Sequence, residues 1–318
     1  MGYVTAPRGL IADLVTPLKE NGEIDGPGLG RHLDRVLPHV HAIWIASPYA
    51  GEGFTLSALQ REDLLDKTLV VVRSRMPLLV WVTQETEDET KKTFSLLEKR
   101  LEARNYHGPV FWVDTPLHYH SNRGLSVHYH NLCTTASKPW VLHNDPDLVM
   151  RRGRPFKRNN IRTAILKNLT RIEQIQGLIF VGSLERAGNY HKAARKRPEF
   201  RVYDGDESHF LTYPSMSGVV SAGANLAPNG WRKIVEASLN MANGREDYPD
   251  RLQQLWETGS YLKNLLENYR RFPAAIIKGA LSEMGIIESP RCTTGAKERR
   301  EDARAVANEM KNRGDWEA

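Results

Sequence analysis

Hydrophobic and polar residues alternate between two kinds of segment along this 318-residue chain. Short apolar runs of strand length recur, and most are followed by a segment whose apolar residues have helical spacing. Residues 27–37 are of the helical kind, with Leu29, Leu33 and Leu37 on one face. Residues 175–183, IQGLIFVGS, are of the strand kind and are apolar on both faces. A strand that is apolar on both faces is typical of a parallel sheet covered by helices.

The pattern predicts eight strands, at residues 10–18, 42–47, 77–83, 109–116, 139–144, 175–183, 200–206 and 218–225. Predicted helices lie between them, among them residues 27–37, 57–74, 124–136 and 161–169. This alternation over about 230 residues matches the size of a (β/α)8 TIM barrel, so we predict an α/β barrel over residues 1–228. Residues 229–318 show helical patterns only, which predicts a C-terminal α-helical subdomain.

Composition places the chain among soluble globular proteins, because 40% of its residues are hydrophobic and 26% are charged. We find no apolar run near the roughly 20 residues that span a bilayer, which predicts no membrane partner. The N-terminal sequence MGYVTAPRG lacks the charged head and apolar middle of a signal peptide. A cytoplasmic location is therefore expected.

The formal net charge of +6 is concentrated in part in two basic clusters. The first contains Arg151, Arg152, Arg154, Lys157 and Arg158, and the second contains Lys297, Arg299 and Arg300. The first cluster follows the fifth predicted strand, and arginines there favour an acidic small-molecule ligand. Nucleic-acid binding would need several aromatic side chains between the basic groups, and only Phe156 is present, so we predict no nucleic-acid partner.

Several short motifs occur in a fixed order along the chain. They are Thr16-Pro17, Gly22, Ile24-Asp25, Gly51-Glu52, Thr55-Leu56-Ser57, Thr115-Pro116, Gly124-Leu125, Asn144, Pro146, Gly205-Asp206, residues 218–225 (GVVSAGAN) and residues 272–278 (FPAAIIK). As an ordered set they resemble the dihydrodipicolinate synthase and N-acetylneuraminate lyase family of class I aldolases. The resemblance covers roughly residues 9–296 and implies a barrel fold, whereas fold alone does not fix function.

The resemblance implies a lysine on the sixth strand that forms a Schiff base with a 2-oxo acid. In this chain that position falls on Ile179 or Phe180. The family's tyrosine before Asn-x-Pro is His143 here, and its paired hydroxyl residues are Tyr49 and Ala50. A hydrocarbon side chain has no nucleophilic atom. We therefore predict a divergent family member that lacks the Schiff-base lysine.

Two other lysines, Lys19 and Lys157, fall on predicted loops at the same end of the barrel. A solvated lysine keeps a pKa near about 10.4 and is a weak nucleophile at neutral pH. We predict that neither replaces the missing amine.

Candidate site residues fall at the predicted C-terminal ends of strands, where barrel enzymes hold their active sites. We predict His143 as the general acid–base, because imidazole titrates near neutral pH, and Tyr49 and Tyr119 as catalytic residues that orient the substrate. The predicted substrate-binding residues are Ala50, Gly51, Glu52, His118, Asn144, Phe180, Ser183, Ser221, Ala222 and Gly223. Backbone amides at residues 50–51 and 221–223 are expected to bind an anion. Asp114 and Asp206 fall at the same strand ends.

Three histidines leave a metal open as an alternative. His118 and His120 lie two residues apart after the fourth strand, and His143 follows on the next strand. Imidazoles so placed can share a zinc-like ion. The spacing lies in a loop and is not supported by a His-x-x-Glu or Cys-x-x-Cys motif, so we predict no metal and no cofactor.

We predict a lyase or hydratase that acts on an oxo acid or other acidic small molecule without a lysine Schiff base. The alternative is a catalytically inactive family member that serves as a binding or assembly protein. A pocket filled around Phe180 would favour this alternative, and an open pocket would favour the enzyme. The resemblance implies a homodimer or homotetramer.

Overall fold

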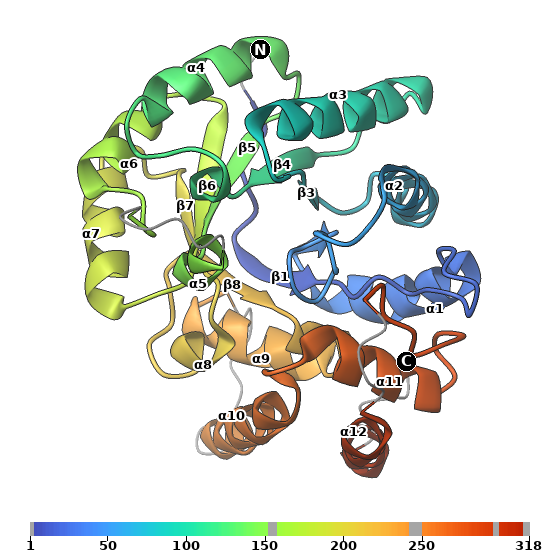
Figure 1. The fold of residues 1–318 in the computed structure, drawn as a ribbon. Coiled ribbons are helices and arrows are strands. Elements are labelled where there is room, and N and C mark those ends of the chain that lie inside the picture. Colours follow the sequence, from blue (N-terminus) through green and yellow to red (C-terminus); the bar gives the residue numbers. More distant parts are fainter. Residues whose placement is uncertain (1–2, 152–157, 242–249, 295–298, 314–318) are drawn as a thin grey trace.

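The computed structural model describes residues 3–151, 158–241, 250–294 and 299–313. In these residues eight parallel strands close into a barrel in sequence order, which confirms the predicted α/β (β/α)8 fold (Figure 1). The strands are β1 (Gly9–Asp13), β2 (Ala42–Ile45), β3 (Leu78–Trp81), β4 (Val110–Asp114), β5 (Trp140–Asn144), β6 (Ile175–Phe180), β7 (Arg201–Asp204) and β8 (Gly218–Ser221).

Helices surround this barrel as an outer layer (Figure 1). They are α1 (Gly26–Val36), α2 (Ala58–Val72), α3 (Glu87–Ala103), α4 (Leu125–Thr135), α6 (Thr163–Leu169), α7 (Leu184–Ala194) and α9 (Pro228–Ser238). Two short helices, α5 (Pro146–Met150) and α8 (Glu207–Phe210), lie at the ends of β5 and β7. Short 3-10 helices follow α1, β4 and β8: η1 (Leu37–His39), η2 (Pro116–His118) and η3 (Gly223–Asn225). Two helix starts carry capping boxes, at Ser57 before α2 and at Thr86 before α3.

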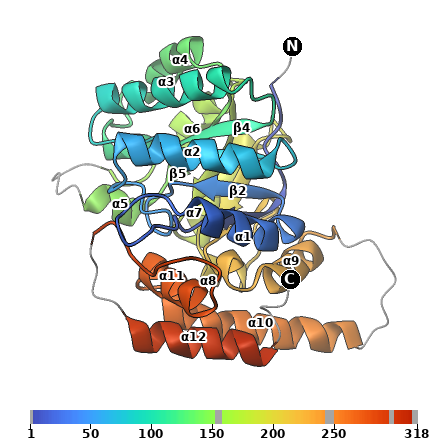
Figure 2. The same ribbon diagram turned by 90° about the vertical axis from the view of Figure 1, so that its right-hand side faces the viewer.

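The C-terminal part is helical, as predicted. It contains α10 (Asp250–Tyr269), α11 (Pro273–Glu283) and α12 (Arg300–Arg313). These three helices lie together on one side of the barrel, outside the ring (Figures 1 and 2). α10 packs against α9 and reaches α8 and η3 at the end of the barrel. The boundary between residues 228 and 229 stays a prediction. Of the helices in the described ranges, we find none that combines the length and apolar character needed to cross a bilayer.

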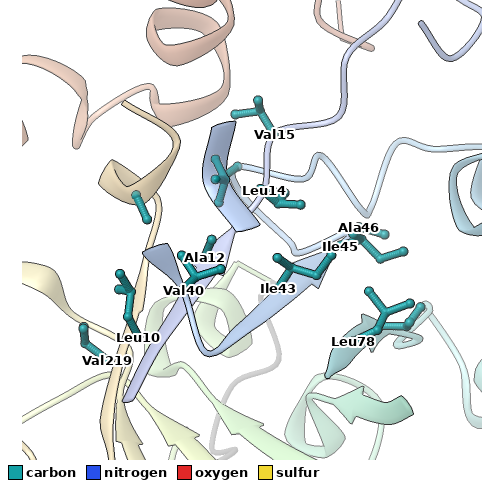
Figure 3. Close-up of a cluster of buried hydrophobic side chains, with 14 of the residues drawn as sticks. Leu10, Ala12, Leu14, Val15, Val40, Ile43, Ile45, Ala46, Leu78 and Val219 are labelled. Atoms are coloured by element: carbon teal, nitrogen blue, oxygen red, sulfur yellow. The ribbon is translucent and has the colours of Figure 1, made fainter. Parts of the chain in front are cut away.

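Alternate strand residues point to opposite sides of the barrel wall. Ile11, Trp44, Trp81 and Ile179 belong to one cluster inside the barrel. The residues between them belong to a second cluster that packs against the helices. Figure 3 shows part of this outer cluster on neighbouring strands. Asp13 and His143 have the parity of the inner cluster, so they continue the barrel interior at its C-terminal end.

Several strands are shorter than the apolar pattern predicts. β1 ends at Asp13, yet Leu14 and Val15 stay buried in the outer cluster (Figure 3). The Leu14 N–H donates to the carbonyl of Trp44 at 2.9 Å, and that of Val15 donates to Asn225 Oδ1 at 3.1 Å. Apolar residues indicate burial rather than strand pairing. The predicted strands therefore extend beyond the hydrogen-bonded residues into loops that are buried.

A buried ion pair joins the barrel to the C-terminal helices. Lys278 of α11 is fully buried, and its Nζ lies 2.6 Å from Glu52 Oε2 in the loop after β2. Glu52 Oε1 accepts a second bond from the Thr293 N–H at 2.7 Å. Residues 241 positions apart in the chain are thereby held together.

Candidate active site at the barrel mouth

A cavity of ≈ 510 Å³ lies where the C-terminal ends of the strands meet the C-terminal helices. Strand residues Asp13, Trp44, His143 and Ile179 line it from the barrel. Its other wall includes the end of α10 and the turn before α11. A cavity of this size suits a small molecule, and its place at the strand ends is where barrel enzymes hold their chemistry.

Asp13 is a carboxyl group with little access to water. Its Oδ1 is buried and has no hydrogen-bond partner among the residues that the structure describes. Burial raises its pKa to about 7, although a hydrogen bond from Ser47 opposes the shift, and the nearby Glu207 carboxyl adds to it. Asp13 is therefore close to half ionised at neutral pH.

Glu207, at the start of α8, also lines the cavity, as do three further carboxyl groups, those of Asp145, Asp147 and Asp206. Its Oε1 accepts three hydrogen bonds, from Ser221 Oγ at 2.5 Å, the Gly223 N–H at 2.8 Å and the Tyr269 hydroxyl at 2.9 Å. Burial nevertheless raises the pKa of Glu207 to about 7. The three donors hold the carboxyl group in one orientation and leave Oε2 for another partner.

His143 is held as a neutral imidazole. Burial lowers its pKa to about 4, against a smaller opposing effect of Asp145. Its Nδ1 lies 2.8 Å from Thr115 Oγ1, which accepts a bond from Trp81 Nε1 at 3.0 Å. The Thr115 hydroxyl therefore has its own proton to donate to Nδ1, which favours the tautomer with the proton on Nε2. We expected His143 to titrate near neutral pH. Its lowered pKa instead keeps the ring neutral at that pH, and its Nε2–H is a hydrogen-bond donor.

Tyr49 stands at the edge of the cavity. Its hydroxyl donates to Asp145 Oδ2 at 2.8 Å, and the guanidinium of Arg151 lies 5.1 Å from the centre of its ring. Burial, together with Asp145, raises the pKa of the Tyr49 phenol well above its usual range, so it stays protonated. Arg270 and Arg271 add positive charge to the same cavity lining.

The first basic cluster is only partly represented at the mouth. Arg151 lines the cavity, and Arg158 is exposed and does not line it. Arg152, Arg154 and Lys157 lie outside the described residues, as does Lys297 of the second cluster.

Three of the predicted site residues line the cavity, namely His143, Tyr49 and Ala222. Asp206 also lines it, and its carboxylate caps α8. The predicted catalytic Tyr119 does not: its hydroxyl donates to Asp114 Oδ2 at 2.7 Å, in a cluster that also contains His128. This is a correction, caused by a loop that turns back toward the helices after β4.

His118 and Asn144 are also turned away from the cavity. The His118 ring lies 4.8 Å from that of Phe54, and the histidine faces Glu85 at 3.5 Å. The Asn144 amide bonds to the Asn160 side chain at 3.0 Å and accepts the Ile161 N–H at 2.7 Å. Both residues hold loops in place.

Phe180, predicted to bind substrate, lies on the other side of the barrel wall. It belongs to the outer cluster, 4.9 Å from the ring of Tyr190 on α7. Its neighbour Ile179 lines the cavity instead. Adjacent residues of a strand face opposite sides, so only one of these two can line the cavity. Phe180 therefore does not fill the barrel mouth.

Two of the backbone amides predicted to bind an anion already have partners within the protein. The Gly51 N–H donates to Ser47 Oγ at 2.8 Å, and that of Gly223 donates to Glu207. Ser221 gives its hydroxyl proton to the same carboxylate. The donors of Ser221 and Gly223 therefore bind the Glu207 side chain rather than a substrate anion.

The remaining predicted residues take structural positions. Ala50 is fully buried beside Gly51, and Glu52 pairs with Lys278. Ser183 is exposed, and its hydroxyl accepts the Arg186 N–H at 3.4 Å at the start of α7. We place these residues outside the cavity lining.

Among the residues that the structure describes, no lysine lines the cavity. Lys278 is engaged by Glu52, and Lys19 is partly exposed beside Glu23 at 3.4 Å. Lys157 lies outside the described residues.

The three histidines proposed as metal ligands do not come together. His143 lines the cavity, whereas His118 packs on Phe54 and His120 stacks on His128 with ring centroids 4.9 Å apart.

Sequence analysis missed Asp13, Glu207 and Tyr269. Asp13 gave a usable signal, because it is a charge two residues after Ile11 in an apolar strand and so shares its face. Glu207 follows the Gly205-Asp206 motif directly. Tyr269 gave none, because its bond to Glu207 joins residues 62 positions apart.

Asp13 and Glu207 predict a pH dependence of stability. Their folded-state pKa values of about 7 exceed the ordinary values of 3.8 for Asp and 4.5 for Glu. Their stabilising contribution is therefore full below about pH 4 and is lost as pH rises through 7. His143 acts in the opposite direction, since its folded pKa is lowered, so the difference between proteins is the useful quantity.

As pH rises from 5 to 8, the stability of the double variant Asp13→Asn/Glu207→Gln relative to the parent is expected to increase by on the order of 5 kcal/mol, about half from each group. Urea unfolding at the two pH values measures this gain. An exposed carboxylate on α1 provides the control Asp34→Asn, which is expected to show no such gain. A pH-independent difference for the double variant would contradict the assignment.

Known proteins with similar sequences belong to one family. The model of the dihydrodipicolinate synthetase family matches residues 6–310. A 4-hydroxy-tetrahydrodipicolinate synthase from Thermotoga maritima is 27% identical over 285 residues, which cover 89% of this chain and 90% of that protein. The synthase from Archaeoglobus fulgidus is 26% identical over 263 residues, 75% of this chain and 78% of that protein.

Solved structures give the same fold. The dihydrodipicolinate synthase from Thermotoga maritima superposes with a TM-score of 0.77 at 20% identity, covering 97% of this chain and 99% of that one. A prophage protein from E. coli K12 of the dihydrodipicolinic acid synthase family, solved in complex with pyruvate, gives a TM-score of 0.77 at 18% identity, covering 96% and 98%. At these identities the likeness concerns the fold alone.

Proposed function

Because the chain belongs to the dihydrodipicolinate synthetase family, we propose that its lyase-like activity resides in the barrel-mouth cavity and proceeds without a lysine Schiff base. The substrate class is an oxo acid or another acidic small molecule. The two carboxyl groups of Asp13 and Glu207 carry the proton transfers, and His143 and Tyr49 orient the substrate.

One observation carries this proposal. The cavity that the fold places at the catalytic end of the barrel is open, and its described lining holds titratable carboxyl groups but no lysine. Ile179 takes the cavity-lining position of β6. A disused pocket would be expected to fill with apolar side chains, since buried carboxyl groups are costly.

Asp13 and Glu207 suit acid–base work at neutral pH. A group with a pKa near 7 is close to half ionised there, so one carboxylate can accept a proton while the other carboxylic acid donates one. In an elimination, the carboxylate takes the proton on the carbon next to the substrate's carbonyl group. The electron pair of that C–H bond forms a carbon–carbon double bond as the C–O bond of a hydroxyl on the next carbon breaks. The carboxylic acid gives its proton to this hydroxyl, which leaves as water.

Charge on the substrate is met by donors around this pair. The imidazole Nε2–H of His143 can donate to the carbonyl oxygen as negative charge develops on it. Arg151, Arg270 and Arg271 in the cavity lining can bind a carboxylate, which arginine grips through two parallel N–H donors.

The proposal is tested by proton exchange in D2O, because proton removal next to a carbonyl group can be seen without knowing the full reaction. The protein is incubated with pyruvate, 2-oxobutyrate or 2-oxoglutarate, and loss of the C3 proton signal is followed by NMR. Exchange above the protein-free rate with at least one acid supports the enzyme. Absence of exchange, together with no ligand-induced rise in melting temperature across the same acids, would favour the binding or assembly protein.

Borohydride treatment is expected to leave no covalent adduct with pyruvate, since reduction traps only an imine. Intact-protein mass spectrometry before and after treatment measures this. A family member that carries the strand lysine serves as the positive control and is expected to gain the mass of the reduced adduct. An adduct on this chain would contradict the lysine-free mechanism, and peptide mapping would identify the amine.

The resemblance further supports a homodimer or homotetramer as the working assembly. Light scattering on the eluting protein would decide between these and a monomer.

A further inference from the structure

A second cluster of ionisable side chains lies outside the cavity, where the loop after β4 meets α3 and α4. Glu87 is the first residue of α3, His120 follows η2, and His128 lies on α4. One ligand atom from each of the three lies within 4.8 Å of the others. We propose that Glu87, His120 and His128 bind a divalent transition metal ion of the zinc class, with water in the remaining position.

Two of the ligand atoms already have the spacing of a coordination site. His128 Nδ1 lies 3.2 Å from Glu87 Oε1. Bonds of about 2.0–2.1 Å in tetrahedral geometry place neighbouring ligand atoms about 3.3–3.4 Å apart. Only His120 has to move closer, and it is half-buried at the end of a loop.

Hydrogen bonding fixes the tautomer of His120 in the form that a metal needs. Its Nδ1 lies 2.6 Å from the carbonyl oxygen of Ser121. A carbonyl oxygen only accepts, so Nδ1 carries the proton and Nε2 keeps its lone pair. A backbone carbonyl on the second nitrogen is the usual support of a metal-binding histidine.

His128 is oriented by a relay of polar groups. The Tyr119 hydroxyl donates to Asp114 Oδ2 at 2.7 Å, and its oxygen lies 3.2 Å from His128 Nε2. Because that hydroxyl proton is committed to Asp114, the oxygen accepts from Nε2–H, and Nδ1 keeps its lone pair toward Glu87. Tyr129 and Thr83 bond to the same carboxylate at 2.6 and 2.7 Å.

One charged group competes with a metal ion in this cluster. Lys91 Nζ lies 2.6 Å from Glu87 Oε1, and the lysine side chain is 47% exposed. A divalent ion has to displace this ammonium group.

The proposed metal site joins α3, α4 and the loop after β4. None of its three residues lines the barrel-mouth cavity, so its test does not depend on the proposed reaction. A bound ion would hold the loop after β4 against α3 and α4. Binding to the folded state alone raises the melting temperature by mass action.

The test uses the full-length chain without an affinity tag, treated with a chelator and then titrated with Zn²⁺ by calorimetry. We expect one ion per chain and a higher melting temperature with Zn²⁺. Co²⁺ is expected to give the visible absorption bands of a low-symmetry site. His120→Ala and Glu87→Gln are expected to weaken Zn²⁺ binding by at least about tenfold, the range seen when metal sites lose support.

Two further variants make the test specific. His130→Ala removes an exposed histidine from α4, two residues from His128, and is expected to bind Zn²⁺ like the parent. Lys91→Met removes the competing ammonium group and is expected to tighten binding. Circular dichroism confirms that each variant is folded. Equal affinity in the parent, His120→Ala and Glu87→Gln would overturn the proposal, as would loss of binding in His130→Ala alone.

Discussion

Glu207→Gln is expected to lower the rate of C3 proton exchange by about 10²–10³-fold, within the range that general acid–base catalysis contributes. The amide has the shape of the carboxyl group, and its oxygen can still accept from Ser221, Gly223 and Tyr269. What the substitution removes is a proton-accepting group with a pKa of about 7. The effect therefore measures proton transfer rather than packing.

The matched comparison uses carboxylate-to-amide changes throughout. Asp13→Asn is expected to lower the rate by a similar factor, and Asp34→Asn on the exposed face of α1 is expected to leave it unchanged. Exchange rates are measured across pH 5–9 with each variant, alongside melting temperatures as a check on folding. A rate in Glu207→Gln within threefold of the parent would remove Glu207 from the mechanism.

Lys278→Met is expected to lower the free energy of unfolding by about 3–5 kcal/mol, the cost of leaving one partner of a buried ion pair alone. Lys278 is 0% exposed and Glu52 is 7% exposed, so water cannot replace the lost partner. The Glu52 carboxylate would keep its bonds from the Thr293 N–H and hydroxyl, neither of which is charged. We expect a larger loss than for an exposed ion pair, because this buried pair joins the loop after β2 to α11.

Urea denaturation of single and double variants separates the charge from the packing. Glu52→Gln/Lys278→Met removes both charges and is expected to recover part of the loss. Arg304→Met is the control, because it breaks an ion pair with Glu283 whose side chains are 62% and 37% exposed, and we expect less than about 1 kcal/mol. A loss below 1 kcal/mol for Lys278→Met would show that the buried pair contributes little.

The C-terminal helices take part in the candidate site as well as in stability. Tyr269, the last residue of α10, donates to Glu207, and Arg270 lines the cavity. The barrel alone would leave Glu207 without one of its three donors. The geometry of the candidate site and the attachment of these helices are therefore linked.

The architecture could be predicted from the sequence alone. Each strand and most helices between the strands are local features, since apolar periodicity and capping residues act over a few positions. The helix predicted from residue 57 does begin there, with Ser57 as its N-cap, and the order of strands and helices is as predicted. The resemblance narrowed the family's lysine position on β6 to Ile179 or Phe180. These neighbours face opposite sides of the strand, and only the structure shows that Ile179 is the one that lines the cavity.

Only the tertiary structure decided which polar groups meet at the mouth. Tyr119 and His118 follow a strand end in sequence, but their loop folds back toward α3 and α4, and loop residues have no fixed periodicity that reveals their direction. Glu52 pairs with Lys278 across 226 positions, a distance over which sequence spacing carries no geometric information. The pKa values of Asp13 and His143 depend on removal from water by the whole barrel, so residue type predicted a candidate chemistry and burial determined its protonation.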